Sequence, residues 1–193
     1  MDNSYNIIRK SYINILNSLG LNYVIVKADT GAMGGKKSEE FMVTNPNGED
    51  KIIYCNNCEY ASNSELATSV PEKAKEEKKA KEELVFTGEN KSVKDVSNFF
   101  NSSSKKLVKT LIYKVEKELI GLLLRGDREV ELTKLKNYFN TEQVKLASAE
   151  EIKEKFGCSP GFIGPFNTKI KLYADEEIKY MYNFIVGANK DKY

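Results

Sequence analysis

Hydrophobic residues recur at intervals of three and four positions between residues 5 and 19, and Gly20 follows them directly. This spacing places the apolar side chains on one face of a helix, and glycine favours a helix end. The pattern predicts an amphipathic helix at the start of the chain. After it, residues 23–26 form a short apolar run typical of a β-strand.

Two further apolar segments, 40–44 and 51–55, flank the sequence Asn45-Pro46-Asn47-Gly48. Proline fixes one turn dihedral and Asn-Gly tolerates positive φ, so these residues favour a β-hairpin. Residues 1 to about 66 are therefore predicted to form a helix and an antiparallel sheet.

The segment from 71 to 83 is almost entirely charged, and only Ala74 and Ala80 interrupt it between its ends. A segment without an apolar face has nothing to bury, so we expect a solvated helix or a linker. A nucleic-acid patch is the alternative, but acidic side chains are interspersed among the basic ones and weaken it. We place the domain boundary here: a first domain at 1–66, a linker at 67–83 and a second domain at 84–193.

The second domain begins with strand-like residues at 84–87, and then Ser92 and Asp95 have the spacing of a capping box before a helix. The serines at 102–104 are predicted to cap a helix that carries residues 105–110. A strand over 111–115 and a turn at 116–118 are expected to follow.

Residues 119–124 form a continuous apolar run, as in a strand buried on both faces, and should occupy the centre of a sheet. A helix is predicted at 132–139, and Ser148 with Glu151 forms a second capping box before a helix that Gly157 ends. Further strands are expected at 169–173 and 181–186. Alternating helices and strands indicate an α/β fold of the α+β type, with a mixed sheet covered by helices.

The overall charge limits what the chain can bind. Of its 193 residues, 30 are basic and 28 acidic, which gives a net charge of +2. Contact with a nucleic acid must then come from local clustering of charge. No apolar run approaches the roughly 20 residues of a membrane helix, and the first residues do not resemble a signal peptide, so we expect a cytoplasmic protein without membrane contact.

The reactive side chains exclude several mechanisms. Cys55 and Cys58 have the spacing of half a zinc site, but Cys158 is the only other cysteine and the chain has no histidine. We therefore expect no metal and no cofactor, and a strand-end turn at this pair. Without histidine, Ser-His-Asp and Cys-His mechanisms are excluded, which leaves lysine, carboxylates, backbone amides or the substrate itself.

Three motifs near the N-terminus carry a resemblance: residues 28–35 (ADTGAMGG), 38–41 (SEEF) and 60–63 (YASN). They resemble the class II catalytic-core segment of bacterial prolyl-tRNA synthetases, which usually has histidine where Glu39 stands. The class II signatures that bind ATP are not among these residues, so this chain alone is not expected to aminoacylate tRNA.

A second stretch, from about Thr87 to Asn189, resembles the editing domain inserted in the same synthetases. The matching motifs are Val108-Lys109-Thr110-Leu111, Leu124-Arg125-Gly126-Asp127, Gly161-Phe162-Ile163-Gly164-Pro165 with Asn167, and Gly187-Ala188-Asn189. The family usually has asparagine at the position of Glu131 and a histidine shortly after Gly-Ala-Asn, where this chain stops at Tyr193.

This resemblance implies deacylation of mischarged tRNA(Pro), chiefly Ala-tRNA(Pro). The expected partners are the tRNA acceptor end carrying a small amino acid and the remainder of a synthetase. A catalytically silent tRNA-binding or structural insert is the alternative. The resemblance also implies that the base is a ribose hydroxyl of the substrate, which acts with a bound water.

The resemblance also assigns roles to residues. Lys109 would hold a phosphate or nearby oxygens of the terminal adenosine, and the glycine loop would present N–H groups; the alternatives are a surface lysine and a plain connecting loop. Asp127 would orient Arg125 or a water. The alternative is that Arg125 and Asp127 belong to an ordinary strand-end turn. The implied catalytic residues are Lys109, Gly161, Gly164 and Pro165. The implied substrate-binding residues are Thr110, Arg125, Asp127, Phe162, Ile163, Asn167, Gly187 and Asn189.

Overall fold

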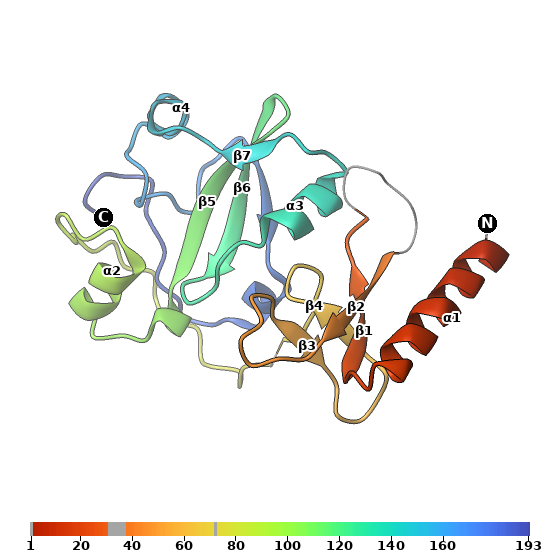
Figure 1. Cartoon of the computed structure of the whole chain (residues 1–193). Helices are drawn as coiled ribbons and strands as arrows, with labels where there is room; N and C mark the ends of the chain where they lie inside the picture. Colours follow the sequence, from red (N-terminus) through yellow and green to blue (C-terminus); the bar gives the residue numbers. More distant parts are fainter. Residues whose placement is uncertain (1, 31–37, 72) are drawn as a thin grey trace. The chain divides into compact units, whose positions relative to one another are not determined.

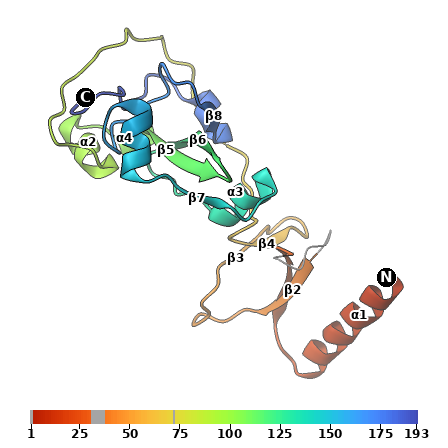
Figure 2. The same ribbon diagram turned by 90° about the horizontal axis from the view of Figure 1, so that it is seen from above.

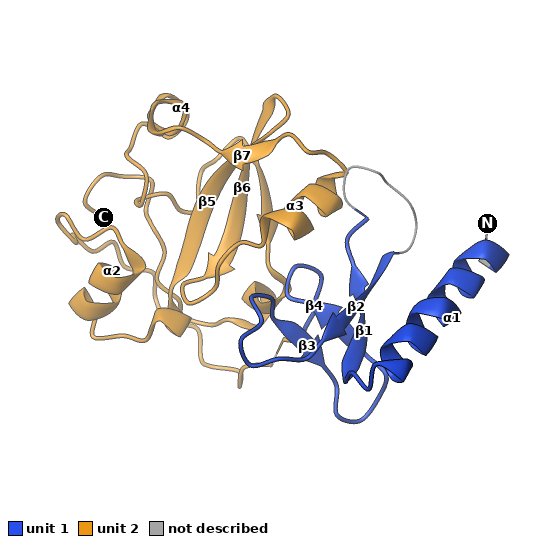
Figure 3. Cartoon of the chain, viewed as in Figure 1, with its two compact units in different colours: residues 1–69 blue, residues 70–193 orange. Residues whose placement is uncertain are grey.

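The computed structural model describes residues 2–30, 38–71 and 73–193. The chain divides into two compact units, Met1–Ser69 and Val70–Tyr193 (Figure 3). None of the helices in the described residues is both long and apolar enough to cross a membrane.

The first unit consists of one helix and a four-stranded sheet (Figure 1). The predicted helix is confirmed, and an αL glycine, Gly20, follows it with φ 65°. The sheet has the strand order β2-β1-β4-β3. The elements are α1 (Asp2–Ser18), β1 (Tyr23–Ala28), β2 (Ser38–Val43), β3 (Ile52–Tyr54) and β4 (Ala61–Asn63).

Residues 40–44 and 51–55 do not pair with each other, so the predicted hairpin is wrong. The turn itself forms, because the N–H of Gly48 donates to the carbonyl of Asn45 at 3.0 Å. However, β2 and β3 lie at opposite edges of the sheet, because the buried strands β1 and β4 take its centre. β1 and β4 are parallel, so this sheet is mixed rather than antiparallel. The motif at 28–35 lies largely outside the described residues.

The second unit is built on a mixed four-stranded sheet of order β7-β5-β6-β8. The predicted buried strand at 119–124 is confirmed as β6, one of the two central strands. β6 pairs antiparallel with β5 and parallel with β8. The strands are β5 (Val108–Val115), β6 (Glu118–Arg125), β7 (Val144–Leu146) and β8 (Lys171–Ala174).

Helices cover both faces of this sheet, as predicted (Figure 2). Leu135 of α3 packs in a cluster with Tyr113 and Leu124, whereas Ile152 of α4 packs with Ile112 on the opposite face. The predicted capping box of α4 is present. The helices are α2 (Val93–Phe99), α3 (Leu132–Phe139) and α4 (Ala149–Phe156), with 3-10 turns η2 (Ser104–Lys106) and η3 (Glu176–Tyr180).

Three expectations in the second unit are wrong. The helix expected over 105–110 is only the 3-10 turn η2, because the apolar alternation from Val108 onward continues into β5. Residues 84–87 and 181–186 are not strands. Instead, the N–H of Thr87 bonds to the carbonyl of Lys192, and Ile185 forms an isolated bridge with Leu107. The described residues between 71 and 83 have no regular secondary structure, so the alternative of a solvated helix is wrong for them.

Candidate functional site

A cavity of about 1630 Å³ lies in the second unit at the beginning of β5. The loop 161–167, the segment 181–188 and part of the linker also line it. The cavity brings together most of the residues that the sequence motifs single out, although they come from distant parts of the chain. Those that line it are Lys109, Thr110, Gly161, Phe162, Ile163, Pro165, Asn167 and Gly187.

Lys109 reaches this cavity from a strand, β5, and not from the helix that its sequence suggests. Its side chain is only 16% exposed, and its Nζ lies 2.8 Å from Oε1 of Glu129, which is 87% exposed. The ammonium is therefore held at the protein surface by a solvated carboxylate. Such a pair contributes at most about 1 kcal/mol, so an incoming phosphate can displace Glu129 at little cost. Sequence reasoning did not single out Glu129, which belongs to no motif.

Asn189 fixes the glycine loop from behind the cavity wall. Its Oδ1 accepts the N–H of Gly164 at 2.8 Å, and its Nδ2 donates to the carbonyl of Phe166 at 2.5 Å. Its own N–H donates to the carbonyl of Phe162 at 2.9 Å. Asn189 does not line the cavity. Its side-chain amide therefore holds the loop and is not free to bind a substrate.

The glycines of the loop are required by close contact between two stretches of main chain. A Cβ placed on Gly164 would overlap the carbonyl oxygen of Gly187, and one placed on Gly187 would lie 2.6 Å from the carbonyl oxygen of Ile163. Gly161 has φ 97°, a conformation that other residues rarely adopt. The loop is therefore locked against the 187–189 segment.

This packing changes which N–H groups the loop can offer. The N–H of Gly164 is bonded to Asn189, and that of Phe162 to the carbonyl of Ser159 at 3.3 Å. Within the described chain, the N–H groups of Gly161 and Ile163 have no acceptor. The expectation that Gly164 presents its N–H is therefore corrected, and the N–H groups of Gly161 and Ile163 are the ones that stay without an acceptor in the described chain.

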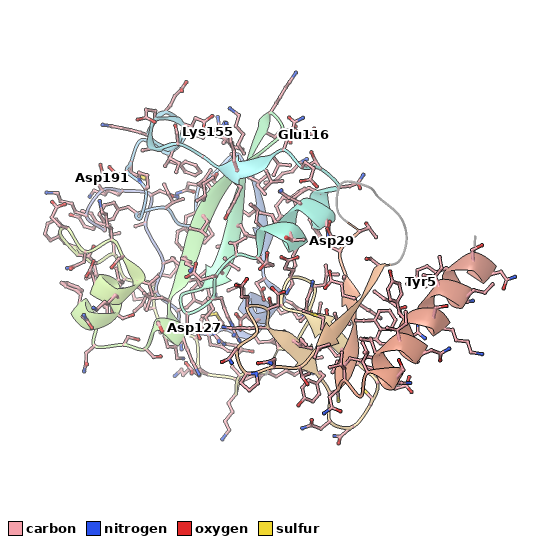
Figure 4. The ribbon with its side chains drawn as sticks, viewed as in Figure 1. Tyr5, Asp29, Glu116, Asp127, Lys155 and Asp191 are labelled. Atoms are coloured by element: carbon pink, nitrogen blue, oxygen red, sulfur yellow. The ribbon has the colours of Figure 1, made fainter. Side chains whose placement is uncertain are left out.

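Arg125 and Asp127 do not line this cavity. They form a bidentate ion pair in which Arg125 Nη2 lies 2.9 Å from Asp127 Oδ2, and Arg125 Nη1 reaches Glu177 at 2.9 Å. Figure 4 shows Asp127 at the end of the β5–β6 hairpin opposite its tip, where Glu116 lies. The hydrogen bond from Arg125 lowers the pKa of Asp127, and the same bond raises the pKa of Arg125. This network ties β6 to η3, a structural function that the sequence did not reveal because Glu177 is distant and outside every motif.

The two positions that differ from the family pattern have local structural functions. Glu131 is the N-cap of α3, and its carboxylate accepts the N–H of Thr133 at 3.3 Å. Asparagine is also a good N-cap, so the difference preserves the cap. In the first unit, Glu39 accepts hydrogen bonds from Tyr5 Oη at 3.1 Å and from Arg9 Nε at 2.8 Å.

None of the three cysteines lines the cavity. Cys55 and Cys58 are exposed, whereas Cys158 is buried, and burial raises the pKa of its thiol. A hydrogen bond from the N–H of Asn57 lowers the pKa of Cys55. The described residues contain no group of three or more side chains arranged to hold a metal ion.

The fold and the motifs at the cavity agree with a comparison with known families. The chain belongs to the aminoacyl-tRNA editing domain family, whose model matches residues 87–193. Its second unit is therefore an aminoacyl-tRNA deacylase domain that acts in editing. The crystal structure of a hypothetical protein shares this fold, with a TM-score of 0.52 and 21% identity over 56% of this chain and 74% of that one.

The chain is also similar, over nearly its whole length, to part of the proline--tRNA ligases. The chain is 45% identical over 191 residues to proline--tRNA ligase of Sulfurihydrogenibium sp., covering 98% of this chain and 34% of the relative. It is 46% identical over 193 residues to that of Persephonella marina, again covering 98% and 34%. The chain thus spans about a third of the length of these relatives.

Proposed function

We propose that this chain removes a small amino acid from mischarged tRNA(Pro), with Ala-tRNA(Pro) as its chief substrate, as part of a cytoplasmic proline--tRNA ligase. One observation carries the proposal. A partly buried lysine and a glycine loop whose conformation is fixed by Asn189 line the same cavity. The cavity thus offers a cation from one face of the sheet and a rigid loop from the other, on either side of the start of β5.

The remainder of the ligase is the proposed partner of the first unit, which we propose is a flank of its class II catalytic core. The helix α1 supports this proposal. Its apolar residues Ile8, Tyr12 and Ile15 are each more than half exposed, and a surface of this kind is typical of a protein interface.

A second site for alanine follows from the limits of binding energy. A pocket shaped for proline cannot firmly reject alanine, because missing methylenes cost the smaller substrate only about 1–3 kcal/mol. An editing cavity can reverse the selection by admitting the alanyl group and excluding the prolyl ring on size. The buried side chains of Phe162 and Ile163 set the wall against which this selection would take place.

The hydrolysis itself requires little from the protein, because an aminoacyl ester is already activated. Lys109 exchanges Glu129 for a phosphate of the acceptor end and so positions the ester. The oxygen of a water attacks the ester carbonyl, and the N–H groups of Gly161 and Ile163 stabilise the developing oxyanion. The ester C–O bond then breaks, which releases the amino acid and leaves the ribose hydroxyl on the tRNA. Since the chain has no histidine, the neighbouring ribose hydroxyl takes the proton of the attacking water and passes its own proton to the departing ribose oxygen.

The main test is the replacement of Lys109 by alanine. We expect Lys109→Ala to lower kcat/KM for Ala-tRNA(Pro) deacylation about 100-fold, because the acceptor end loses its positioning charge. The matched control is Lys114→Ala on the same strand. Lys114 pairs with Glu151 and does not line the cavity, so its loss should leave the rate unchanged.

Two results would count against the proposal. Equal rates for the wild type and Lys109→Ala would remove this lysine from the mechanism and favour a silent tRNA-binding insert. Equal hydrolysis of Ala-tRNA(Pro) and Pro-tRNA(Pro) by the wild type would remove the size selection.

A further inference from the structure

One edge of the central strand β5 is open at Thr110. β5 pairs with β6 along its whole length, whereas β7 covers only its last three residues. Nearer the start of the strand, the N–H of Val108 donates to the carbonyl of Ile185 at 2.8 Å. The next bond on this edge is from the N–H of Ala147 to the carbonyl of Ile112, at 2.9 Å. Within the described chain, no strand covers the edge between these two bonds.

The main-chain groups of Thr110 face this opening. In an antiparallel pair, alternate residues direct both their N–H and C=O to the same edge. Val108 and Ile112 use the edge away from β6, so Thr110 uses it too. Neither of its main-chain groups has a partner among residues 2–30, 38–71 and 73–193. Its side-chain Oγ1 is buried and also lacks a partner there.

The cavity passes around this edge. Successive side chains of a strand point to opposite faces, so Lys109 and Thr110 lie on different faces of the sheet. Thr110 lies on the face of Gly121 and Ile170, and its Cγ2 would be 3.7 Å from a Cβ placed on Gly121. Both Lys109 and Thr110 line the cavity, which therefore follows the open edge from one face to the other.

An unpaired buried hydroxyl is destabilising, so its combination with an uncovered main-chain N–H and C=O on a residue that lines a cavity indicates a ligand. Two of the three, the C=O and Oγ1, can accept hydrogen bonds. At the reacting end of an aminoacyl-tRNA, the strongest donor is the α-amino group. The ester carbonyl needs donors, which Gly161 and Ile163 supply, and the phosphate needs a cation, which Lys109 supplies.

We infer that Thr110 binds the α-amino group of the aminoacyl ester through its C=O and Oγ1. This inference rests on the proposed function and deepens it by assigning the group that holds the amino end of the substrate. A protonated alanyl group has three N–H donors. The ring of a prolyl group replaces one of them with carbon and leaves two. Two donors still satisfy the two acceptors of Thr110, so this contact orients the amino group, and the exclusion of proline rests on the size of its ring.

The test compares Ala-tRNA(Pro) with lactyl-tRNA(Pro), in which a hydroxyl replaces the amino group. We expect the wild type to prefer the alanyl ester in kcat/KM, and Thr110→Val to reduce this preference about tenfold because Oγ1 is lost. Thr110→Ser retains the hydroxyl and should retain the preference. A Thr110→Val variant with the wild-type preference would overturn the inference and leave the proposed hydrolysis intact.

A binding measurement separates this inference from catalysis. The probes are 3′-deoxyadenosines that carry an alanyl or a lactyl group in a hydrolysis-resistant 3′-amide bond. We expect the alanyl probe to bind more tightly than the lactyl probe and to shift the NMR amide signal of Thr110. Equal binding without that shift would refute the inference. Preferential binding with no hydrolysis of either ester would support it and refute the proposed function.

The stability of Thr110→Val shows whether a loss of preference comes from damage to the fold. Removal of an unpaired buried hydroxyl should leave the melting temperature equal to or above that of the wild type. A loss of preference together with retained stability identifies a binding group rather than a structural one.

Discussion

At the scale of single residues, the sequence motifs determine the path of the main chain as much as they supply side chains. The backbones of Gly164 and Gly187 are in contact and support the cavity wall. The side chain of Asn189 stabilises that contact by accepting the N–H of Gly164. Among the motif residues that line the cavity, Lys109, Thr110 and Asn167 offer polar side chains. The glycine loop contributes mainly peptide groups to the cavity wall.

Replacement of Gly164 tests the contact between the two stretches of main chain. We expect Gly164→Ala to lower the free energy of unfolding by about 2–4 kcal/mol, because its Cβ would overlap the carbonyl oxygen of Gly187. Urea denaturation followed by circular dichroism measures this change.

Gly157→Ala is the matched control. Gly157 also has positive φ, 74°, but a Cβ there would meet no atom within 4 Å. Its cost should be only about 1 kcal/mol, from backbone strain alone. If both variants lose the same stability, the contact with Gly187 does not restrict position 164.

The glycines and Lys109 could be named from the sequence because they belong to motifs with a fixed order. Glu129, Glu177 and the free N–H groups of the loop could not, because each depends on which distant segment lies opposite. The assignment of Gly164 as a donor failed for the same reason: no sequence pattern shows that Asn189 occupies its N–H.

At the scale of elements, local signals predicted helices better than strands. The capping residues Ser92 and Ser148 and the αL glycine Gly157 act within a few residues, and the helices α2 and α4 form where they indicate. Strand pairing depends on distant segments instead. The turn at 45–48 therefore forms, yet it joins two edges of a sheet rather than two paired strands. The short strand β7 has no strong sequence pattern of its own and was missed.

The junction between β6 and η3 gives a prediction about pH. The pKa of Asp127 is lowered in the folded protein by its hydrogen bonds with Arg125. A lowered pKa contributes stability above the unfolded-state value, about 4, and this contribution is lost as the pH falls through the folded-state value. We expect Asp127→Asn to lower the melting temperature by about 2–4 °C at pH 7 and by less below pH 4.

Thermal melts from pH 2 to pH 8 measure this difference. Glu118→Gln, at the other end of β6, is the control, because Glu118 is 75% exposed and its nearest cation is 4.0 Å away. It should show no such dependence. A constant difference between the wild type and Asp127→Asn across the pH range would show that the charge of Asp127 does not stabilise the junction.

At the scale of the whole molecule, the linker belongs with the second unit. Asn183 holds it with three hydrogen bonds: from Nδ2 to Glu77 Oε2 at 3.1 Å and to the carbonyl of Lys78 at 3.0 Å, and to Oδ1 from the N–H of Ala80 at 2.9 Å. Lys106 adds an ion pair to Glu77 at 2.6 Å. The charged segment, which the sequence describes only as solvated, therefore forms part of the cavity rim.

This attachment predicts how the linker responds to protease. We expect Asn183→Asp to increase trypsin cleavage within residues 73–81 several-fold, because the new carboxylate repels Glu77 and cannot donate to it. Mass spectrometry of timed digests identifies the cleaved bonds. Asn98→Asp makes the same charge change on the exposed surface of α2 and should leave the rate as in the wild type. Unchanged cleavage in Asn183→Asp would show that Asn183 does not restrain the linker.

The contact between Gly164 and Gly187 also limits how such a domain can acquire new substrates. Where two peptide backbones touch, no substitution can enlarge or reduce the space between them without breaking the wall. Natural variation or protein engineering that aims at a different amino acid must therefore work through the side chains that face the cavity, such as Phe162 and Ile163. The glycine framework would remain constant while the range of accepted esters changes.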